Sequence, residues 1–306
     1  NSLDLQQLGA NELDRDNLQQ VAPSISRLPS GIVSGSFNVS GNSLSKISPN
    51  TISAQGRGSV KLKAGEIQSE NLTIVNGDWQ GIFTTKNLKL SEFNSQIGGR
   101  LSAQATLAGN LKSLTPESIR GVGSGKIDLP QGKIIGSNLQ IDRGKWQGNL
   151  QSSSLVLGGL APEIPLKFRA AKLDGNVRVA GDIQRLKPEY ISAIGNGELN
   201  LADGKIRATD VKLDGGNWSS NLAIANFQLG SINNQLSPQL KTSKISGNFT
   251  VAGNVNKLTP AAIQASGSGK LRLANGGEIG ANGLRIGAGE WQSDLVVRGL
   301  KLGTLN

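Results

Sequence analysis

The chain has 306 residues and contains no histidine, no cysteine and no methionine. Ser-His and Cys-His catalytic pairs therefore cannot be built, and zinc and most transition-metal sites lose their usual ligands. A disulfide is excluded, and so is the side chain that best senses physiological pH. We accordingly expect no enzyme, no catalytic residue, no metal and no cofactor. Because an initiating methionine is missing, we also expect a segment of a longer protein.

Bulky residues and long apolar runs are scarce as well. Aromatic residues make up 4% of the chain and charged residues 18%, whereas glycine occurs 41 times. Such a composition is poor in the side chains that fill a compact globule and rich in residues that form tight turns. No apolar run approaches the length of about 18 residues that would suggest a membrane-spanning helix. Leucine, isoleucine and valine recur regularly, which argues against disorder.

The net charge of +10 comes from scattered lysines and arginines, and no basic run concentrates it. Binding of single-stranded nucleic acid would require aromatic side chains interleaved with these cations. The chain has one tyrosine and six phenylalanines, so we expect no nucleic-acid partner. The carboxylates do not recur with fixed partners, and no Asp-x-Asp-x-Asp-Gly calcium loop is present.

A four-fold internal repeat dominates the sequence. Each repeat has one Gly-x-Trp triplet, one proline followed three residues later by isoleucine, and one Gly-x-Gly. The tryptophans are Trp79, Trp146, Trp218 and Trp291, the prolines are Pro49, Pro116, Pro188 and Pro260, and the Gly-x-Gly segments begin at Gly56, Gly123, Gly195 and Gly267. This period is typical of repeat proteins. It predicts the end of a preceding repeat over 1–40 and repeats over 41–108, 109–180, 181–252 and 253–306 (truncated), in one continuous domain.

Apolar residues also alternate with other residues at four equivalent places in each repeat. Alternation with period two is typical of strands with one apolar face, and intervening segments such as Lys63-Ala64-Gly65 predict antiparallel hairpins. Each proline predicts a short helical turn, although Lys187-Pro188 lacks a capping oxygen. The residues expected to line the apolar face are Val60, Leu62, Leu72, Ile74, Leu88, Leu90, Leu107, Ile127, Leu129, Leu139, Ile141, Leu155, Leu157, Val177, Val179, Leu199, Leu201, Val211, Leu213, Phe227, Leu229, Phe249, Val251, Leu271, Leu273, Leu284, Ile286, Leu300 and Leu302.

The expected fold class is all-β: an elongated antiparallel sheet, curled like a gutter, of about four ~70-residue repeats. About five strands per repeat would give roughly twenty strands, too many for an ordinary flat sheet. At ~4.8 Å per strand, the sheet would extend roughly 100 Å. A parallel β-helix is disfavoured because the apolar pairs are unevenly spaced. The apolar face would be concave, and an uncovered apolar strip is normally a binding surface; an ordinary closed core is the alternative.

The Gly-rich repeat, the Gly-x-Trp hairpin and the Leu-x-Leu strands resemble the TamB family, within the AsmA-like group of envelope proteins. Gly-Asn…Leu-Thr-Pro and Gly-Ser-Gly-Lys are most similar to cyanobacterial members and their plastid relatives, and the resemblance covers essentially the whole chain. It implies a β-taco groove, an inner-membrane anchor outside this segment and a periplasmic or intermembrane location. It also implies an outer-membrane partner of the Omp85 class, phospholipid transfer between membranes and an older proposed role in outer-membrane protein assembly.

Two conspicuous motifs have simpler interpretations. Gly-Ser-Gly-Lys at Gly123–Lys126 and Gly267–Lys270 is similar to a phosphate-binding loop, but it has the wrong spacing and lacks the following serine or threonine. We expect it to form a strand edge. The four tryptophans could contact lipid at an apolar-polar boundary, or they could pack between neighbouring repeats.

Three functions remain open at this point. The first is a groove in which a monomer binds phospholipid or glycolipid and passes it between membranes. The second is a closed structural spacer that connects the inner membrane to an assembly partner in the outer membrane. The third is an enzyme that acts on polysaccharide, which would require a local cluster of acids that breaks the repeat, and the sequence shows none.

Overall fold

A computed structural model describes residues 2–4, 31–41, 51–92, 98–113, 115–159, 168–231, 236–257, 259–274 and 276–300. These residues belong to two compact units, each of which is described by itself. Unit 1 comprises Asn1–Asn149 and Asp182–Gln184, and unit 2 comprises Leu150–Gly181 and Arg185–Asn306. The repeat boundaries given above remain a prediction from sequence periodicity.

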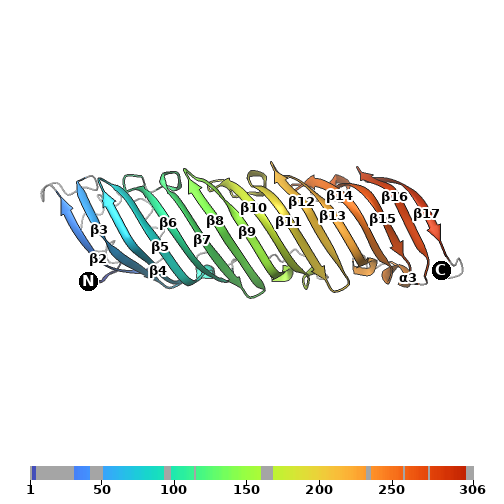
Figure 1. The fold of residues 1–306 in the computed structure, drawn as a ribbon, viewed down its shortest axis with the longest axis horizontal. Helices are drawn as coiled ribbons and strands as arrows, with labels where there is room; N and C mark the ends of the chain where they lie inside the picture. The colour runs from blue at the N-terminus through green and yellow to red at the C-terminus, as the bar shows by residue number, and fades with distance from the viewer. Residues whose placement is uncertain are drawn as a thin grey trace. The chain divides into compact units, whose positions relative to one another are not determined.

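Unit 1 is an antiparallel sheet in which each strand pairs with the next one along the chain (Figure 1). Two short 3₁₀ helices, η2 (Leu90–Glu92) and η3 (Pro116–Ser118), interrupt the strands. The strands are β1 (Ser2–Asp4), β2 (Gly31–Gly41), β3 (Ile52–Leu62), β4 (Gly65–Val75), β5 (Asp78–Lys89), β6 (Arg100–Asn110), β7 (Arg120–Leu129), β8 (Gly132–Asp142) and the beginning of β9 (Lys145–Val156).

Unit 2 contains the rest of β9 and has the same consecutive antiparallel pairing from β10 to β17. Its strands are β10 (Lys172–Asp182), β11 (Ser192–Leu201), β12 (Gly204–Asp214), β13 (Asn217–Gln228), β14 (Lys244–Asn254), β15 (Gln264–Arg272), β16 (Glu278–Gly287) and β17 (Glu290–Arg298). Its helical segments are η4 (Leu157–Gly159), η6 (Pro188–Tyr190), η7 (Leu229–Ser231), α3 (Pro238–Lys241) and η8 (Pro260–Ala262).

The expectation of an all-β, antiparallel fold is confirmed, and the strand pairings give an open sheet in each unit. The expected number of strands was too high, because each repeat contributes four long strands and not five. The apolar pair after the tryptophan was counted as a separate strand. In the structure Trp79 and Leu88 both lie in β5, because a bulge bends this strand without ending it.

The hairpin turns follow the glycine pattern of the sequence. Two-residue turns before each tryptophan have positive φ at both central residues, as in Asn76 (52°) and Gly77 (88°). This is the type I′ geometry, which matches the natural twist of two antiparallel strands. Three-residue helical turns begin at Pro116, Pro188 and Pro260, which confirms the short helical turns predicted at these prolines. The turn predicted at Pro49 lies outside the described residues.

Beta-bulges recur at two fixed places in the repeat. Every Gly-x-Gly faces a register shift on the following strand. The residues at these shifts have φ between 50° and 60° and are Asn71, Asn138, Asp210 and Gly283. A second set with similar φ lies near the end of each tryptophan strand and comprises Asn87, Ser154, Asn226 and Gly299. Bulges bend a strand and increase its twist, so these positions supply the curvature that a large antiparallel sheet requires.

Candidate functional site

The predicted lining residues of unit 1 share one face of its sheet. Directly paired residues in an antiparallel sheet point to the same side. Val60 pairs with Ile67, Ile74 pairs with Trp79, and Leu88 pairs with Leu101. We call this side the apolar face of unit 1, and the opposite side the polar face.

Unit 2 has an apolar face of the same construction. Val211 pairs with Gly195, Leu213 pairs with Trp218, and Phe227 pairs with Ile245. The other predicted residues of β10 to β16 continue the same alternation, whereas Leu273 and Leu300 lie just beyond the ends of β15 and β17. Leu90, Leu157 and Leu229 do not lie in strands, because each begins the 3₁₀ turn that follows a tryptophan strand. Leu302 lies outside the described residues.

The sequence interpretation missed further members of the apolar faces. The strand registers place one more isoleucine of each repeat on the apolar face, near the start of the strand that follows the Gly-x-Gly strand. The sequence signal was present, because each of these residues follows a Gly-Glu or Gly-Lys dipeptide that recurs in every repeat. These residues are Ile67, Ile134, Ile206 and Ile279.

Glycines occupy the middle of each apolar face. At the first glycine of three Gly-x-Gly segments, an added Cβ would lie 2.2 Å from a backbone carbonyl oxygen of the preceding strand. These glycines are Gly56, Gly195 and Gly267. Real Cβ atoms do not approach a carbonyl oxygen so closely, so only glycine permits this close packing of strands on the bent side of the sheet. The Gly-x-Gly segments therefore allow the sheet to bend. The Gly-Ser-Gly-Lys variants lie within β7 and β15, as expected.

The apolar faces are half-buried along most of their extent. Five predicted lining residues are fully buried: Leu88, Leu155, Val179, Phe227 and Leu273, each at 8% exposure or less. Ile286 is exposed, and the other predicted lining residues that the structure describes are half-buried. The closely packed pairs of described elements are neighbours in the sheet, apart from α3 with η7. No second layer is thus seen over either apolar face in the described ranges.

The indole rings of two tryptophans lie against glycines of the next strand. Trp79 pairs with Gly109 and Trp218 pairs with Gly253. A Cβ added to Gly109 or Gly253 would lie 2.9 or 2.7 Å from the indole ring. The indole nitrogens of Trp79, Trp146 and Trp218 are enclosed and have no hydrogen-bond partner within the described residues. The two alternatives for the tryptophans, lipid contact and packing between neighbouring repeats, stay predictions. Trp291 differs, because 65% of its surface is exposed.

A recurrent backbone hydrogen bond involves the glycine that begins three of the Gly-x-Trp triplets. The carbonyl oxygen of this glycine accepts the N–H of a residue in a later connection of the chain. The three bonds run from Leu111 to Gly77 (2.7 Å), from Ile183 to Gly144 (2.8 Å) and from Val255 to Gly216 (2.8 Å). All three glycines are buried and have φ between 77° and 88°. The glycine of the Gly-x-Trp triplet thus forms part of the hairpin turn, and its carbonyl oxygen also binds the segment that follows the next strand.

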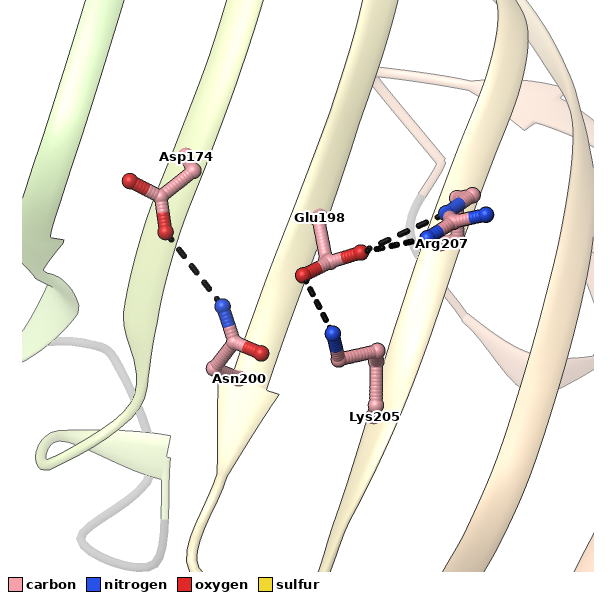
Figure 2. A network of polar contacts seen from close by, with 5 residues as sticks. All are labelled: Asp174, Glu198, Asn200, Lys205 and Arg207. Carbon is pink, nitrogen blue, oxygen red and sulfur yellow. Dashed lines mark hydrogen bonds and ion pairs between the residues drawn. The ribbon is translucent and has the colours of Figure 1, made fainter.

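Ion pairs and side-chain hydrogen bonds lie on the polar faces. In unit 2, Asp174 accepts a hydrogen bond from Asn200 at 3.3 Å. Glu198 contacts Lys205 at 2.7 Å and Arg207 at 3.1 Å (Figure 2). Hydrogen bonds from Lys205 and then Arg207 lower the pKa of Glu198. These contacts join β10 to β11 and β11 to β12, so they favour one register on the solvent side.

A cleft of about 580 Å³ lies in unit 1 near the tryptophan end of β5. Its charged lining consists of Asp78, Glu117, Arg120 and Arg143. Arg120 pairs with Asp142 at 3.1 Å, and the side chain of Gln184 donates a hydrogen bond to Glu117. The hydrogen bond from the Thr115 side chain is the main cause that lowers the pKa of Glu117. Register places Arg120 and Asp78 on the polar face. Trp79 also lines the cleft and pairs with Ile74 of the apolar face, but none of the predicted leucine, isoleucine and valine lining residues borders it.

Comparisons of the chain with protein-family models, with curated proteins and with solved structures found no match. The likeness to the TamB family therefore remains a resemblance carried by the repeat pattern. Within the described ranges, no helix is both long and apolar enough to cross a membrane. The same residues contain no cluster of three or more acidic side chains arranged to hold a metal ion.

Proposed function

We propose that the apolar faces bind the acyl chains of phospholipid or glycolipid, as one segment of a bridge that moves lipid between two membranes. The observation that carries this proposal is the set of half-buried leucine, isoleucine and valine side chains along one side of each sheet. A continuous row of apolar side chains that remains accessible to solvent favours contact with another apolar molecule. The resemblance to the TamB family implies that the molecule bound there is phospholipid on its way between two membranes.

Such a function would require no chemistry from the chain. Val60, Leu139 and Leu213 would contribute contact area, and the glycines would allow the curvature that brings these side chains around a chain of methylene groups. Each buried methylene contributes roughly 0.8 kcal/mol, so even partial burial of an acyl chain would outweigh a few unfavourable contacts. The inner-membrane anchor and an Omp85-type partner would lie in regions outside this chain, and its place would be the periplasm or an intermembrane space.

The first experiment is native mass spectrometry of the chain purified without detergent, followed by extraction and identification of any lipid. We expect co-purified phospholipid or glycolipid, at several copies per chain, and recovery of binding when lipid is added back after delipidation. A lipid-free chain that also ignores phospholipid vesicles and short-chain phospholipid would contradict the proposal.

A structural spacer is the second candidate, and one observation favours it. Phe37 covers the space above Gly56, and Phe249 covers the space above Gly267, so part of each apolar face is filled by the protein itself. In this reading the apolar side chains only hold the sheet together, and the segment sets a distance between membrane partners. Resistance to proteolysis without any bound lipid would support the spacer.

A further inference from the structure

We propose that the cleft at the tryptophan end of β5 binds a phosphate group between Arg120 and Arg143. Both arginines line this cleft, whose volume is about 580 Å³. One water molecule takes roughly 30 Å³, so the cleft has room for a phosphate and for part of the molecule that carries it. A guanidinium group donates two parallel hydrogen bonds to phosphate oxygens. A phosphate monoester has enough terminal oxygens for two arginines, whereas a carboxylate is already occupied by one.

The charges of the cleft favour an anion over a cation. The carboxylate of Asp78 accepts a hydrogen bond from Asn110 at 2.6 Å, and Glu117 accepts one from Gln184. Both acids thus already have donors. The side chain of Arg143 has no ion pair or hydrogen bond with any residue that the structure describes. The cleft therefore contains a guanidinium group that lacks an anionic partner.

Arg120 retains donors for an anion although it forms an ion pair. Its Nε lies 3.1 Å from Oδ1 of Asp142, and the two side chains are 62% and 67% exposed. An ion pair so exposed to water contributes little to stability, so a phosphate can compete for this guanidinium. Within the described ranges the Nη groups of Arg120 have no other partner. They remain available for phosphate oxygens.

Arg143 occupies a backbone position that does not favour arginine. It lies in the turn between β8 and β9 with φ of 49°, and hairpin turns of this geometry prefer asparagine, aspartate and glycine. Residues held in the left-handed region against such a preference cluster at functional sites. The equivalent residues of the other repeats are Asn76, Gly215 and Ala288. The turn therefore forms without arginine in three repeats.

Arg120 is also an exception to the repeat. It lies four residues after Pro116, and the same position in the other repeats is uncharged. The equivalent residues are Ser53, Ser192 and Gln264. The fold thus requires arginine at neither position, yet both arginines line the same cleft. This coincidence points to a ligand of the cleft and not to a contribution to the sheet.

Trp79 connects the cleft to the apolar face. Its indole borders the cleft, and the residue pairs with Ile74 on the apolar face. A lipid would therefore be able to place its phosphate between the arginines while an acyl chain passes over Trp79 onto the apolar face. The assignment of the phosphate to a lipid headgroup rests on the proposed function. The phosphate site itself does not, because a water-soluble phosphate ester presents the same group.

Isothermal titration calorimetry of the whole chain with glycerol phosphate at low ionic strength tests the site. Arg143→Asn introduces the residue that the first repeat has at this turn, so the fold should be kept. We expect its affinity to fall roughly tenfold or more, because hydrogen bonds to charged groups are the stronger ones. The matched control is Arg178→Asn, which removes the same charge from an exposed position on the polar face of β10 and should change nothing.

Three results of this titration would overturn the proposal. The first is a parent chain that does not bind glycerol phosphate. The second is equal affinity of the parent and Arg143→Asn, with folding confirmed by circular dichroism. The third is equal affinity of the parent for succinate, a carboxylate of the same charge, which would show that the cleft does not recognise phosphate.

A second titration identifies the source of the phosphate. Its ligand is short-chain phosphatidic acid below its micellar concentration, whose headgroup without the acyl chains is glycerol phosphate. Tighter binding of the lipid assigns the phosphate to a lipid headgroup, and equal binding assigns it to a water-soluble ester; both results support the phosphate site. Lipid capture by a chain that ignores glycerol phosphate would preserve the proposed function and overturn this inference. Binding of glycerol phosphate by a chain that captures no lipid would do the reverse.

Discussion

The ring of Trp79 lies against the backbone of Gly109, so closely that a Cβ on this glycine would come within 2.9 Å of the indole. The same relationship joins Trp218 to Gly253. A large aromatic surface is thus packed onto a neighbouring strand without a second layer of protein. The arrangement explains how the chain stabilises a sheet with so few bulky residues. In both pairs the space for the indole depends on the missing side chain of the glycine, so tryptophan and glycine act together.

Replacement of Gly253 by alanine should destabilise the protein by about 1–3 kcal/mol, because the added methyl group overpacks against Trp218. The measurement is the free energy of unfolding from a urea titration, followed by circular dichroism. Gly280→Ala is the matched control, because its Cβ would lie 3.7 Å from the nearest atom and should change the stability by less than about 0.5 kcal/mol. Equal stability of both variants would show that the indole moves aside freely.

The two glycines of one Gly-x-Gly should respond very differently to the same substitution. An alanine Cβ at Gly195 would lie 2.2 Å from the carbonyl oxygen of Asn176, whereas at Gly197 the nearest atom would be the carbonyl oxygen of Asp174 at 3.4 Å. Backbone cannot yield as a flexible side chain does. We expect Gly195→Ala to cost about 3 kcal/mol and Gly197→Ala to cost less than about 1 kcal/mol in denaturant titrations. The reverse order would refute the close-approach explanation.

Bulge positions should require residues that tolerate a left-handed backbone. Asn138 has φ of 50°, and asparagine, aspartate and glycine are the residues found at this place in the four repeats. Asn138→Val should cost about 1–2 kcal/mol, because a β-branched side chain is strained there. Asn138→Gly should stay within about 0.5 kcal/mol of the parent. Thermal unfolding of both variants checks the prediction, and a valine variant of unchanged stability would contradict it.

The sequence predicts the apolar faces well, because period-two alternation directly determines which side of a strand a residue occupies. The lining residues Leu139 and Val211, for example, lie where the alternation places them. It also predicts the hairpins, because Gly77 and its equivalents indicate turns with positive φ. The number of strands was not predictable in this way. A bulge such as the one at Asn87 resembles a strand end in the sequence, although the hydrogen-bonded strand continues through it.

Cross-strand relationships were harder to predict, since they depend on register. The pairing of Trp79 with Gly109 follows from register alone, because the two residues are distant in the chain and no local pattern joins them. The network around Glu198 was missed for a different reason. The equivalent residues of the other repeats are Ser59, Lys126 and Lys270, so the charge at this position differs between repeats and leaves no periodic signal.

Acidification should remove the contribution of Glu198. Hydrogen bonds from Lys205 and Arg207 lower its pKa in the folded state. Its stabilising contribution is therefore present above the unfolded-state pKa and is lost as the pH falls through the lowered folded-state pKa. The stability difference between the parent and Glu198→Gln should be largest at neutral pH in low salt, and it should vanish in strong acid. A difference that does not depend on pH would show that the ion pairs contribute nothing.

If lipid binds to the apolar face, a charged residue introduced on that face should interrupt lipid binding. Leu213 is half-buried and faces Trp218, whereas the adjacent Lys212 is exposed on the opposite face. Leu213→Asp places a carboxylate where a methylene chain would lie, and desolvation of this charge opposes binding. Lys212→Asp introduces the same residue on the polar side and serves as the control. We expect lipid capture by the first variant to fall strongly and capture by the second to persist, both measured by native mass spectrometry after confirmation of folding by circular dichroism. Equal lipid content in both folded variants would place the bound lipid elsewhere and favour the structural spacer.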